Sequence, residues 1–525
     1  MKEMKNLFLC CVLLCGAAVL MAQVPEWESA RRAGGNGEDR GNSIAIDSQG
    51  NQYVTGAITY SGNTNIYVGR RGTGGNIIML QQAGGPSNDE GLGIAVDGAG
   101  NVYVTGQFQG YATFGSHSLS SSGGYDIFVA KLSPNGNWLW AVKAGGTSSN
   151  DRGYGIAVDG AGNAYVTGYF QDTATFGSHS LSSSGGYDIF VAKLSPEGIW
   201  VWAINPGGTG NSYGYSIALD GAGNVYATGE FRGTVTFGSS TLTVNSSSTN
   251  ILIVKLDASG NWLWAVKAGG TYSDSGYGIA VDGAGNAYVT GSFSSTATFG
   301  SQTLSTSNVD LFVAKLGPSG NWLWAVKSGG ASLAEGYSIA VDGAGNAYVT
   351  GYFDETITFS NNTLISSGCY DVFVAKITPS GNWLWGVKAG APGDDYGAGI
   401  AVDVAGNAYV TGHFLGTATF GSHTLTSMGF RDIFIAKLSY VLPKAPENVH
   451  VTMNGHNAVI TWDAVAENTH GQSITPDGYR IYKSSDPLGG FTLQGSTSSN
   501  STTYTHSMVG ATQPRMFYRV RAYKN

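Results

Sequence analysis

The sequence predicts an all-β protein, in which a seven-bladed β-propeller of four-stranded blades is followed by an immunoglobulin-like β-sandwich. One unit of about 61 residues recurs seven times, and each copy holds four short strands joined by tight turns. The last 80 residues replace this repeat with a different alternating pattern. Glycine supplies 80 of the 525 residues and charged side chains only 12%, a composition typical of a globular chain rich in turns.

The first 22 residues have the layout of a secretory signal. Lys2 and Lys5 precede an apolar run from Leu7 to Leu20, and the small residue Ala22 follows. The run is too short to cross a bilayer, and no later stretch reaches 18 consecutive apolar residues. We therefore expect a secreted or cell-surface protein without a membrane span. Only Cys369 lies beyond this segment, so the fold cannot depend on an intrachain disulfide.

Seven copies of an aspartate mark the repeated unit, each within a segment such as IAVDGAGNAYVTG. The spacings are 50, 62, 61, 62, 60 and 61 residues, and the marked positions are Asp47, Asp97, Asp159, Asp220, Asp282, Asp342 and Asp403. Fixed periods of this length are typical of arrays in which each unit buries its apolar faces against its neighbours. The spacing predicts seven blades, the first of them shortened.

The unit around Asp159 illustrates the predicted blade. Its four strands are expected at Ile156 to Val158, Ala164 to Phe170, Tyr187 to Leu194 and Ile199 to Ile204, which are rich in β-branched and aromatic residues. The sequence DGAGN joins the first strand to the second, and SPEG joins the third to the fourth. Both supply the residues of tight turns, glycine in each and proline in SPEG. Apolar residues on both faces indicate a sheet packed between two others.

The two ends of the repeat array predict how the ring closes. The seventh unit reaches its third strand, Asp432 to Leu438, and has no fourth strand. At the other end, Trp27 to Gly35 aligns with the fourth strand WLWAVKAGG that starts at Trp138. We expect this N-terminal segment to complete the last blade and so remove the open edges of the array. The propeller is then expected to span residues 24–440.

These repeats resemble those of the bacterial seven-bladed β-propeller repeat family. The resemblance lies in the D-x-x-G-N-x-Y-V-T-G anchor, the D-x-F-V-A-K-L strand and the W-x-W strand, and it covers roughly residues 24–440. It implies an exported or surface protein that is often one piece of a modular chain. It implies no particular reaction, because function resides in sites and not in folds.

A proline-marked linker at residues 441–446 separates the repeats from a second predicted domain at 447–525. Alternating strand patterns start at Val449, Ala458, Tyr479 and Phe517. With Trp462 in the second strand, this set resembles a fibronectin type III domain. The chain stops directly after the last pattern, so we expect the usual final strand to be absent or borrowed. No Arg-Gly-Asp tripeptide is present, and an adhesion role through that motif is not implied.

Several repeated residues are expected to be structural. The DGAGN turns lack the alternating oxygen ligands and the twelfth-position glutamate of a calcium loop. Paired tryptophans such as Trp138 and Trp140 could stack on sugars, but their recurrence in five blades favours packing between blades. The lysines of the third strand are expected to lay their stems over the core and expose the ammonium, at Lys131, Lys193, Lys255, Lys315, Lys376 and Lys437.

The sequence evidence for catalysis is weak, and no motif points to a metal site or a cofactor. His117, His179 and His423 could bind a metal, but they belong to different blades and are expected to be surface residues. Neither a G-x-S-x-G elbow nor an H-E-x-x-H motif occurs. No catalytic residue, metal ligand or cofactor is therefore predicted.

One set of aspartates has two possible interpretations. Five of the seven units carry an aspartate eight residues before the anchor, where the other two carry Ser212 and Ala334; the five are Asp39, Asp89, Asp151, Asp274 and Asp395. These carboxylates could form a ring at the mouth of the central channel that attracts a cation or a polyhydroxylated ligand. Alternatively, each could accept local hydrogen bonds from the backbone of its glycine-rich loop.

The favoured function is an exported, non-catalytic and monomeric binding or adhesion scaffold that recognises a protein or carbohydrate at the cell surface. The tight turns lie on one side of the ring, and variable connections such as Gln171 to Gly186 lie on the other, where recognition is expected. A net charge of −8 argues against nucleic acid as a partner. The alternative is a secreted polysaccharide lyase or hydrolase, which would be favoured if Glu335, Asp394 and Asp395 met in one pocket.

Overall fold

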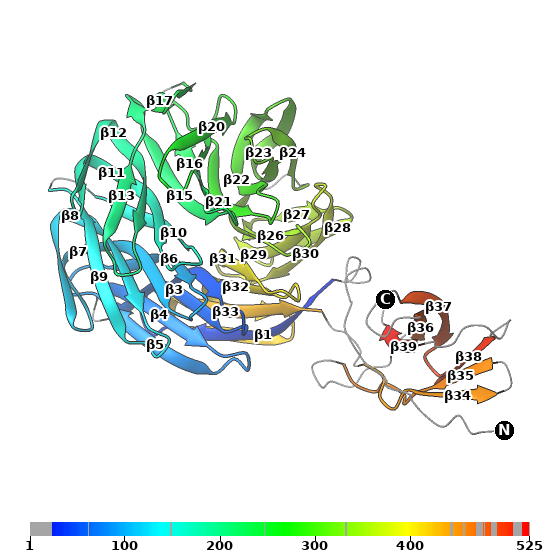
Figure 1. Cartoon of the computed structure of the whole chain (residues 1–525). Helices are drawn as coiled ribbons and strands as arrows, with labels where there is room; N and C mark the ends of the chain where they lie inside the picture. The colour runs from blue at the N-terminus through cyan, green and yellow to red at the C-terminus, as the bar shows by residue number, and fades with distance from the viewer. Residues whose placement is uncertain are drawn as a thin grey trace. The chain divides into compact units, whose positions relative to one another are not determined.

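The computed structural model describes residues 24–525 except 61, 148–149, 246, 331–332, 441–444, 455–456, 469–475, 477, 485–490, 508–516 and 524–525. The predicted signal segment and most of the predicted linker lie outside the described residues. Contacts divide the chain into two compact units, one spanning Trp27–Ser439 and the other including Tyr440–Asn525 (Figure 1). Every described element is a β-strand, and all strand pairs are antiparallel, so the all-β prediction is confirmed. Within the described residues, no helix is long and apolar enough to cross a membrane.

Five four-stranded sheets make up most of the larger unit. In chain order of their first strands they are β2 (Arg40–Ile46), β3 (Gln52–Tyr60), β4 (Asn63–Arg71) and β5 (Ile77–Ala83); β15 (Ser212–Leu219), β16 (Val225–Phe231), β19 (Asn250–Leu256) and β20 (Trp262–Ala268); β21 (Ser275–Val281), β22 (Ala287–Phe299), β23 (Gln302–Leu316) and β24 (Trp322–Lys327); β25 (Ala334–Val341), β26 (Ala347–Phe353), β29 (Asp371–Ile377) and β30 (Trp383–Ala389); and β31 (Tyr396–Val402), β32 (Ala408–Phe420), β33 (His423–Ser439) and β1 (Glu26–Ala33).

An eight-stranded sheet contains two further groups with the same strand order. They are β6 (Glu90–Val96), β7 (Val102–Phe114), β8 (His117–Leu132) and β9 (Trp138–Gly145), and β10 (Arg152–Val158), β11 (Ala164–Phe176), β12 (His179–Leu194) and β13 (Trp200–Ile204). The two groups are joined where β9 pairs with the end of β11. Two small sheets complete the unit, formed by β14 (Gly207–Gly208), β17 (Thr234–Phe237) and β18 (Ser240–Thr243), and by β27 (Thr356–Phe359) and β28 (Asn362–Ile365).

The anchor aspartate closes the turn between the first two strands of each group. Asp159 Oδ1 accepts the amide hydrogens of Ala161 and Asn163 at 3.0 and 2.9 Å, and its Oδ2 accepts the Tyr165 hydroxyl at 3.2 Å. Gly162 has φ of 83°, a left-handed conformation that glycine adopts at little cost. The predicted structural role of the DGAGN turns is confirmed.

The hydrophobic core lies between neighbouring groups. Phe170, Phe176 and Phe190 of the β10–β13 group pack in one cluster with Tyr103 and Ile127 of the preceding group. The fourth-strand tryptophans join the same interfaces: the Trp140 indole donates to the carbonyl oxygen of Pro196 at 3.0 Å, and that of Trp200 to the carbonyl oxygen of Lys143 at 3.3 Å. The tryptophans therefore pack between neighbouring groups, as predicted.

The third-strand lysines differ from the prediction. Lys193 and Lys437 are partly buried, whereas Lys131, Lys255, Lys315 and Lys376 are buried. In three of them the ammonium lies 3.4–3.7 Å from an anchor aspartate, in the pairs Lys255–Asp220, Lys315–Asp282 and Lys376–Asp342. A tyrosine ring lies beneath each ammonium, 4.5–4.7 Å from its centroid. For these four buried lysines the prediction of an exposed ammonium was wrong, because carboxylates and aromatic rings replace water around it.

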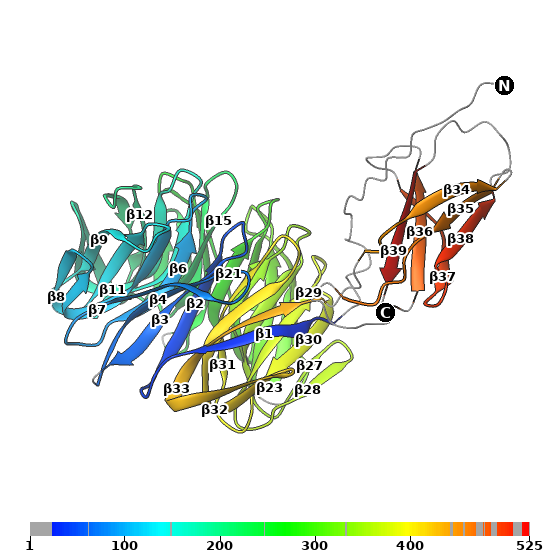
Figure 2. The same ribbon diagram turned by 90° about the horizontal axis from the view of Figure 1, so that it is seen from below.

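The N-terminal strand completes the last sheet, as predicted. β1 pairs with β33 in the order β1-β33-β32-β31, and Figure 2 shows the two strands side by side. The Trp27 ring packs edge-on against Phe420 at 5.2 Å, and the Arg32 guanidinium lies 2.6 Å from the Asp432 carboxylate. The first strand β2 packs against both β6 and β31, so the first sheet contacts the second and the last.

The second and third strands run further than predicted in several groups. In the β10–β13 group they continue as paired strands through Phe176 and His179, in a segment that the sequence analysis treats as a variable loop. This outer hairpin reaches the preceding group, because Thr175 pairs with Gly145 of β9. Equivalent bridges join five other pairs of groups, at Gly84–Thr113, Gly207–Thr236, Gly269–Thr298, Gly329–Thr358 and Gly390–Thr419.

The smaller unit contains two three-stranded antiparallel sheets. One is formed by β34 (His450–Asn454), β35 (Asn457–Thr461) and β38 (Thr503–Ser507), and the other by β37 (Thr492–Ser498), β36 (Gly478–Ser484) and β39 (Phe517–Tyr523). Both sheets contribute to one core, in which Ile460 from the first packs with Ile481 and Val520 from the second. The Trp462 and Tyr479 rings lie 5.2 Å apart in this core.

Candidate functional site: the inner tyrosine arc

The five aspartates singled out in the sequence are fully buried. One oxygen of Asp39 accepts the Gly35 amide at 2.6 Å, and the other accepts the Thr59 amide at 2.6 Å. The same pair of backbone hydrogen bonds recurs at Asp89, Asp151, Asp274 and Asp395. These carboxylates hold the loop that enters each first strand, which is the local interpretation of the two that the sequence left open.

Burial dominates the electrostatics of these carboxylates. It raises the pKa of Asp89 and of Asp274 to about 6, and that of Asp395 to about 7, against the opposing effect of the backbone hydrogen bonds. The pKa of Asp39 is raised by the same cause. Within the described residues, no group of three or more His, Cys, Asp or Glu side chains could hold a metal ion.

The side chains that alternate with these aspartates are partly accessible. From Asp39 into β2, Asp39 and Gly41 are buried, whereas Arg40 and Asn42 are only partly buried, because successive residues of an extended chain point to opposite faces. The residues one and three positions after each aspartate position therefore share a face of the innermost strands. In Figure 1 these first strands lie toward the middle of the larger unit.

Four consecutive first strands present a tyrosine on this face. We call Tyr154, Tyr215, Tyr277 and Tyr337 the inner tyrosine arc; they lie on β10, β15, β21 and β25. Neighbouring rings are 5.5, 5.7 and 5.2 Å apart between centroids, within the range of favourable aromatic contacts. The arc continues through Tyr352 and Tyr396 at one end and through Tyr169 and Tyr213 at the other.

Two largely buried glutamates lie beside the arc. Burial raises the pKa of Glu335, while hydrogen bonds with Tyr337 and Tyr352 lower it to a smaller extent. Burial likewise raises the pKa of Glu230, whose carboxylate bonds with Ser275 and Tyr215. Each carboxylate is thus fixed by hydroxyl donors in an aromatic surrounding.

The opposite part of this inner face is polar. Glu90 accepts hydrogen bonds from the Asn42 amide at 2.9 Å and the Gln107 amide at 3.3 Å. These residues adjoin a cavity of about 180 Å³ lined by Glu38, Arg40, Ala57, Thr64, Asn88, Glu90, Gln107 and Tyr125. The Gln107 side chain is 7% exposed, and its Oε1 has no hydrogen-bond partner. One residue of the cavity lining thus carries a buried acceptor without a partner.

Arg431 lies between the tyrosines and the polar residues of the inner face. The Arg431 guanidinium lies 5.3 Å above the Tyr396 ring and 3.3 Å from the Asp394 carboxylate. His413 stacks on Tyr396 at 4.9 Å. Burial, aided by the positive charges of Arg431 and Arg40, lowers the pKa of His413 to about 3, so this imidazole is neutral at physiological pH.

The acidic pocket that would favour an enzyme does not form. Glu335 bonds with tyrosines, Asp394 pairs with Arg431, and Asp395 bonds with backbone amides. Sequence reasoning selected the repeated aspartate and missed the residue after it. The sequence did contain a signal, because the residue after the nearly constant aspartate position differs between the seven units. In chain order these residues are Arg40, Glu90, Arg152, Tyr213, Ser275, Glu335 and Tyr396.

Comparison with known proteins identifies the repeated unit. Five segments match the beta-propeller repeat SBBP, at residues 80–107, 139–169, 264–292, 328–352 and 385–413. An uncharacterized WD repeat-containing protein of Acanthamoeba polyphaga mimivirus is 26% identical over 381 residues, which cover 58% of this chain and 27% of that protein. The chain thus spans about a quarter of this relative's length.

Solved structures that match this chain over most of its length have low sequence identity and low TM-scores. Sqt1 from Chaetomium thermophilum is 9% identical with a TM-score of 0.41, covering 79% of this chain and 99% of its own. A puromycin hydrolase is 11% identical with a TM-score of 0.40, covering 81% of this chain and 59% of its own. From the matching segments and the antiparallel sheets described above, we conclude that the chain is an all-β protein that carries beta-propeller repeats.

Proposed function

We propose that the protein is an exported, non-catalytic scaffold that binds a glycan through the inner tyrosine arc and its polar counterpart. The larger unit is then a seven-bladed β-propeller closed by β1, and the smaller unit an immunoglobulin-like domain of the fibronectin type III kind. The closure is supported by the pairing of β1 with β33 and the packing of β2 against both β6 and β31. Two sheets around a core containing Trp462 support the second assignment.

One observation carries the glycan proposal: four consecutive tyrosines in contact line the same face as a cluster of amide, carboxylate and guanidinium groups. Aromatic rings with hydroxyl tips cover apolar surface and still bond to polar groups. Sugar rings have both kinds of surface, with C–H faces for the rings and hydroxyls for side chains such as Gln107 and Glu90. Binding sites of this class combine aromatic walls with a few polar groups that fix orientation.

The test is a glycan array probed with residues 24–525, followed by titration of the best ligand. Tyr277→Ala and Tyr337→Ala are expected to weaken binding at least about tenfold, the loss of roughly 1.4 kcal/mol of contact. Tyr111→Ala is the matched control, because Tyr111 is an exposed tyrosine of an outer hairpin. Unchanged affinity in both arc variants, or binding to a protein array and to no glycan, would rule out the proposal.

A second candidate is a secreted polysaccharide lyase or hydrolase. The observation in its favour is Glu335, a largely buried carboxylate with a raised pKa beside Tyr337, since such perturbed groups act as general acids in enzymes. Incubation of the array's ligands with the protein distinguishes the two functions. Release of shorter chains, lost in Glu335→Gln, would favour the enzyme; intact ligands would favour the scaffold.

A further inference from the structure

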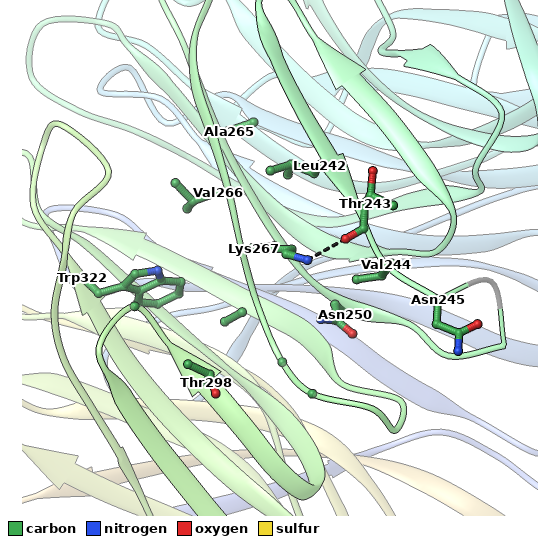
Figure 3. A pocket seen from close by; sticks show the side chains of 14 residues that line it. Leu242, Thr243, Val244, Asn245, Asn250, Ala265, Val266, Lys267, Thr298 and Trp322 are labelled. Carbon is green, nitrogen blue, oxygen red and sulfur yellow. Dashed lines mark hydrogen bonds between the residues drawn. The ribbon is translucent and has the colours of Figure 1, made fainter.

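A second cavity, of about 860 Å³, is lined by residues from three neighbouring sheets of the larger unit. Figure 3 shows its lining side chains, which come from β18, β19 and β20 on one side and from β22 and β24 on the other. The volume is within the roughly 300–1,000 Å³ of small-molecule sites. Lys267 lies in the middle of this lining (Figure 3).

In four other groups of strands, the lysine or arginine at the position of Lys267 forms an ion pair with a buried aspartate. The fourth strand supplies the cation and the start of the third strand supplies the carboxylate. The nitrogen-to-oxygen distances are 2.6–3.1 Å, in the pairs Arg32–Asp432, Lys143–Asp126, Lys327–Asp310 and Lys388–Asp371. The aspartate side chains of these pairs are at most 3% exposed, so the pairing is partly desolvated and stronger than one at the surface.

In the group formed by β15, β16, β19 and β20, the lysine is present but the aspartate is replaced. Asn250 stands at the aspartate position of β19, and its side-chain amide lies against the carbonyl oxygens of Thr249 and Gly270. Within the described residues, Lys267 has no carboxylate partner; its ammonium donates to the Thr243 carbonyl oxygen at 2.6 Å (Figure 3). The β10–β13 group shows the reverse change, because Asp188 is kept there and Asn205 replaces the lysine.

The Lys267 side chain is exposed to solvent, and the walls around it are partly polar, through Asn245, Asn250 and Thr298, and partly apolar. Leu242, Val244 and Val266 line the cavity together with the indole of Trp322. A ligand that neutralises Lys267 therefore needs a carboxylate at one end and an apolar or flat body at the other. We propose that this cavity binds an organic carboxylate, whose acid group takes the place of the missing aspartate and whose body lies against the aliphatic side chains and Trp322.

The probe that tests this site is phenylacetate, with neutral phenylacetamide as its matched counterpart, titrated into residues 24–525 by calorimetry. Phenylacetate is expected to bind, and phenylacetamide to bind at least about tenfold more weakly because it forms no charge-assisted hydrogen bond with Lys267. Lys267→Met is expected to remove the preference for the acid. Equal binding of acid and amide, or no binding of phenylacetate at about 10 mM, overturns the proposal.

A second variant separates the site from general effects of substitution. Asn250→Asp restores the aspartate that sister strands carry, so the variant folds, and its carboxylate occupies Lys267 in place of the ligand. It is expected to lose phenylacetate binding, whereas Lys388→Met, which removes a cation already paired with Asp371, leaves it unchanged. Unaltered binding in Asn250→Asp contradicts the proposal, as does equal loss in Lys388→Met with an unchanged melting temperature.

Discussion

Single residues of the repeat divide into those that hold the blade and those that differ between blades. Asp159 and its equivalents bind turn amides and a tyrosine hydroxyl, and the aspartates eight residues earlier bind loop amides. The alternating positions of the same strands, such as Tyr277 and Glu335, vary from group to group. A repeated residue in this chain therefore supports folding, and we propose that the variable residues of the inner face serve recognition.

The buried aspartates make stability depend on pH in a defined direction. Burial raises the pKa of Asp395 from 3.8 to about 7 in the folded state, so folded protein binds a proton more tightly than unfolded protein. Its contribution is fully present below pH 3.8 and is lost as pH rises toward about 7. Asp395→Asn, which leaves one backbone amide unpaired, is expected to cost about 2 kcal/mol near pH 4.5 and less at pH 8, as measured by denaturant unfolding.

Asp257 provides a control with the opposite sign. Hydrogen bonds from Asn261 lower its pKa, so its contribution to stability is present above the unfolded pKa and is lost as pH falls. Asp257→Asn should therefore cost more stability near neutral pH than in acid, where the contribution of the carboxylate is lost. The same pH trend in both variants would contradict the raised pKa of Asp395.

Although β1 is the first strand in the chain, it belongs to the last sheet of the larger unit. It supplies the fourth strand of a sheet whose other strands lie some 370 residues further along the chain. Trp27 anchors it, through the Phe420 ring and a 3.0 Å hydrogen bond to the Lys388 carbonyl. Without β1, the edge of β33 would be unpaired and open to association with other chains.

Trp27→Ala tests this anchoring. Removing a tryptophan that is 7% exposed leaves a cavity and is expected to cost about 3 kcal/mol of unfolding free energy. Leu139→Ala, at an exposed position of β9, serves as control and should cost less than about 0.5 kcal/mol. Equal melting temperatures for both variants would show that β1 adds nothing to the larger unit. Deletion of Glu26–Gly35 should in addition cause aggregation, seen as an increase in light scattering.

The outer hairpins also join neighbouring groups of strands, but one interface has no such hairpin. Bridges such as Gly84–Thr113 join neighbouring groups, but the first sheet has only the short connection after Tyr60 and before Asn63 between β3 and β4. This absence accounts for the 50-residue spacing of the first two anchors. The contact between the last sheet and the first is thus held without such a bridge in the described residues.

Hydrogen exchange should find this interface the first to open. Amides of β1 and β2 are expected to exchange faster than those of the equivalent strands β9 and β10, because local opening there breaks fewer hydrogen bonds. Mass spectrometry of peptides covering residues 27–46 and 138–158 makes the comparison. Equal protection of the two segments would mean that the outer hairpins do not limit opening.

For the whole molecule, the sequence predicted the architecture better than the site. Glycine turns, period and the Trp27–Gly35 alignment all follow from local chemistry, which is why the all-β repeat and the placement of β1 could be predicted. The burial of Lys255 and the outer hairpins depend on what the neighbouring group presents, which no single repeat reveals. The inner tyrosine arc was missed because Tyr154 and Tyr277 come together only when separate strands are placed side by side.

The last prediction concerns the two compact units. Contacts divide the chain near Tyr440, and each unit has its own core, one around residues such as Phe434 and the other around Trp462. A segment crossed by few contacts opens to proteases at little cost. Limited proteolysis should therefore cut first within residues 440–446 and release a fragment ending there that melts at the temperature of the larger unit in the full chain. First cuts inside the repeats, or a fragment that melts earlier than the full chain, would show that the two units depend on each other for folding.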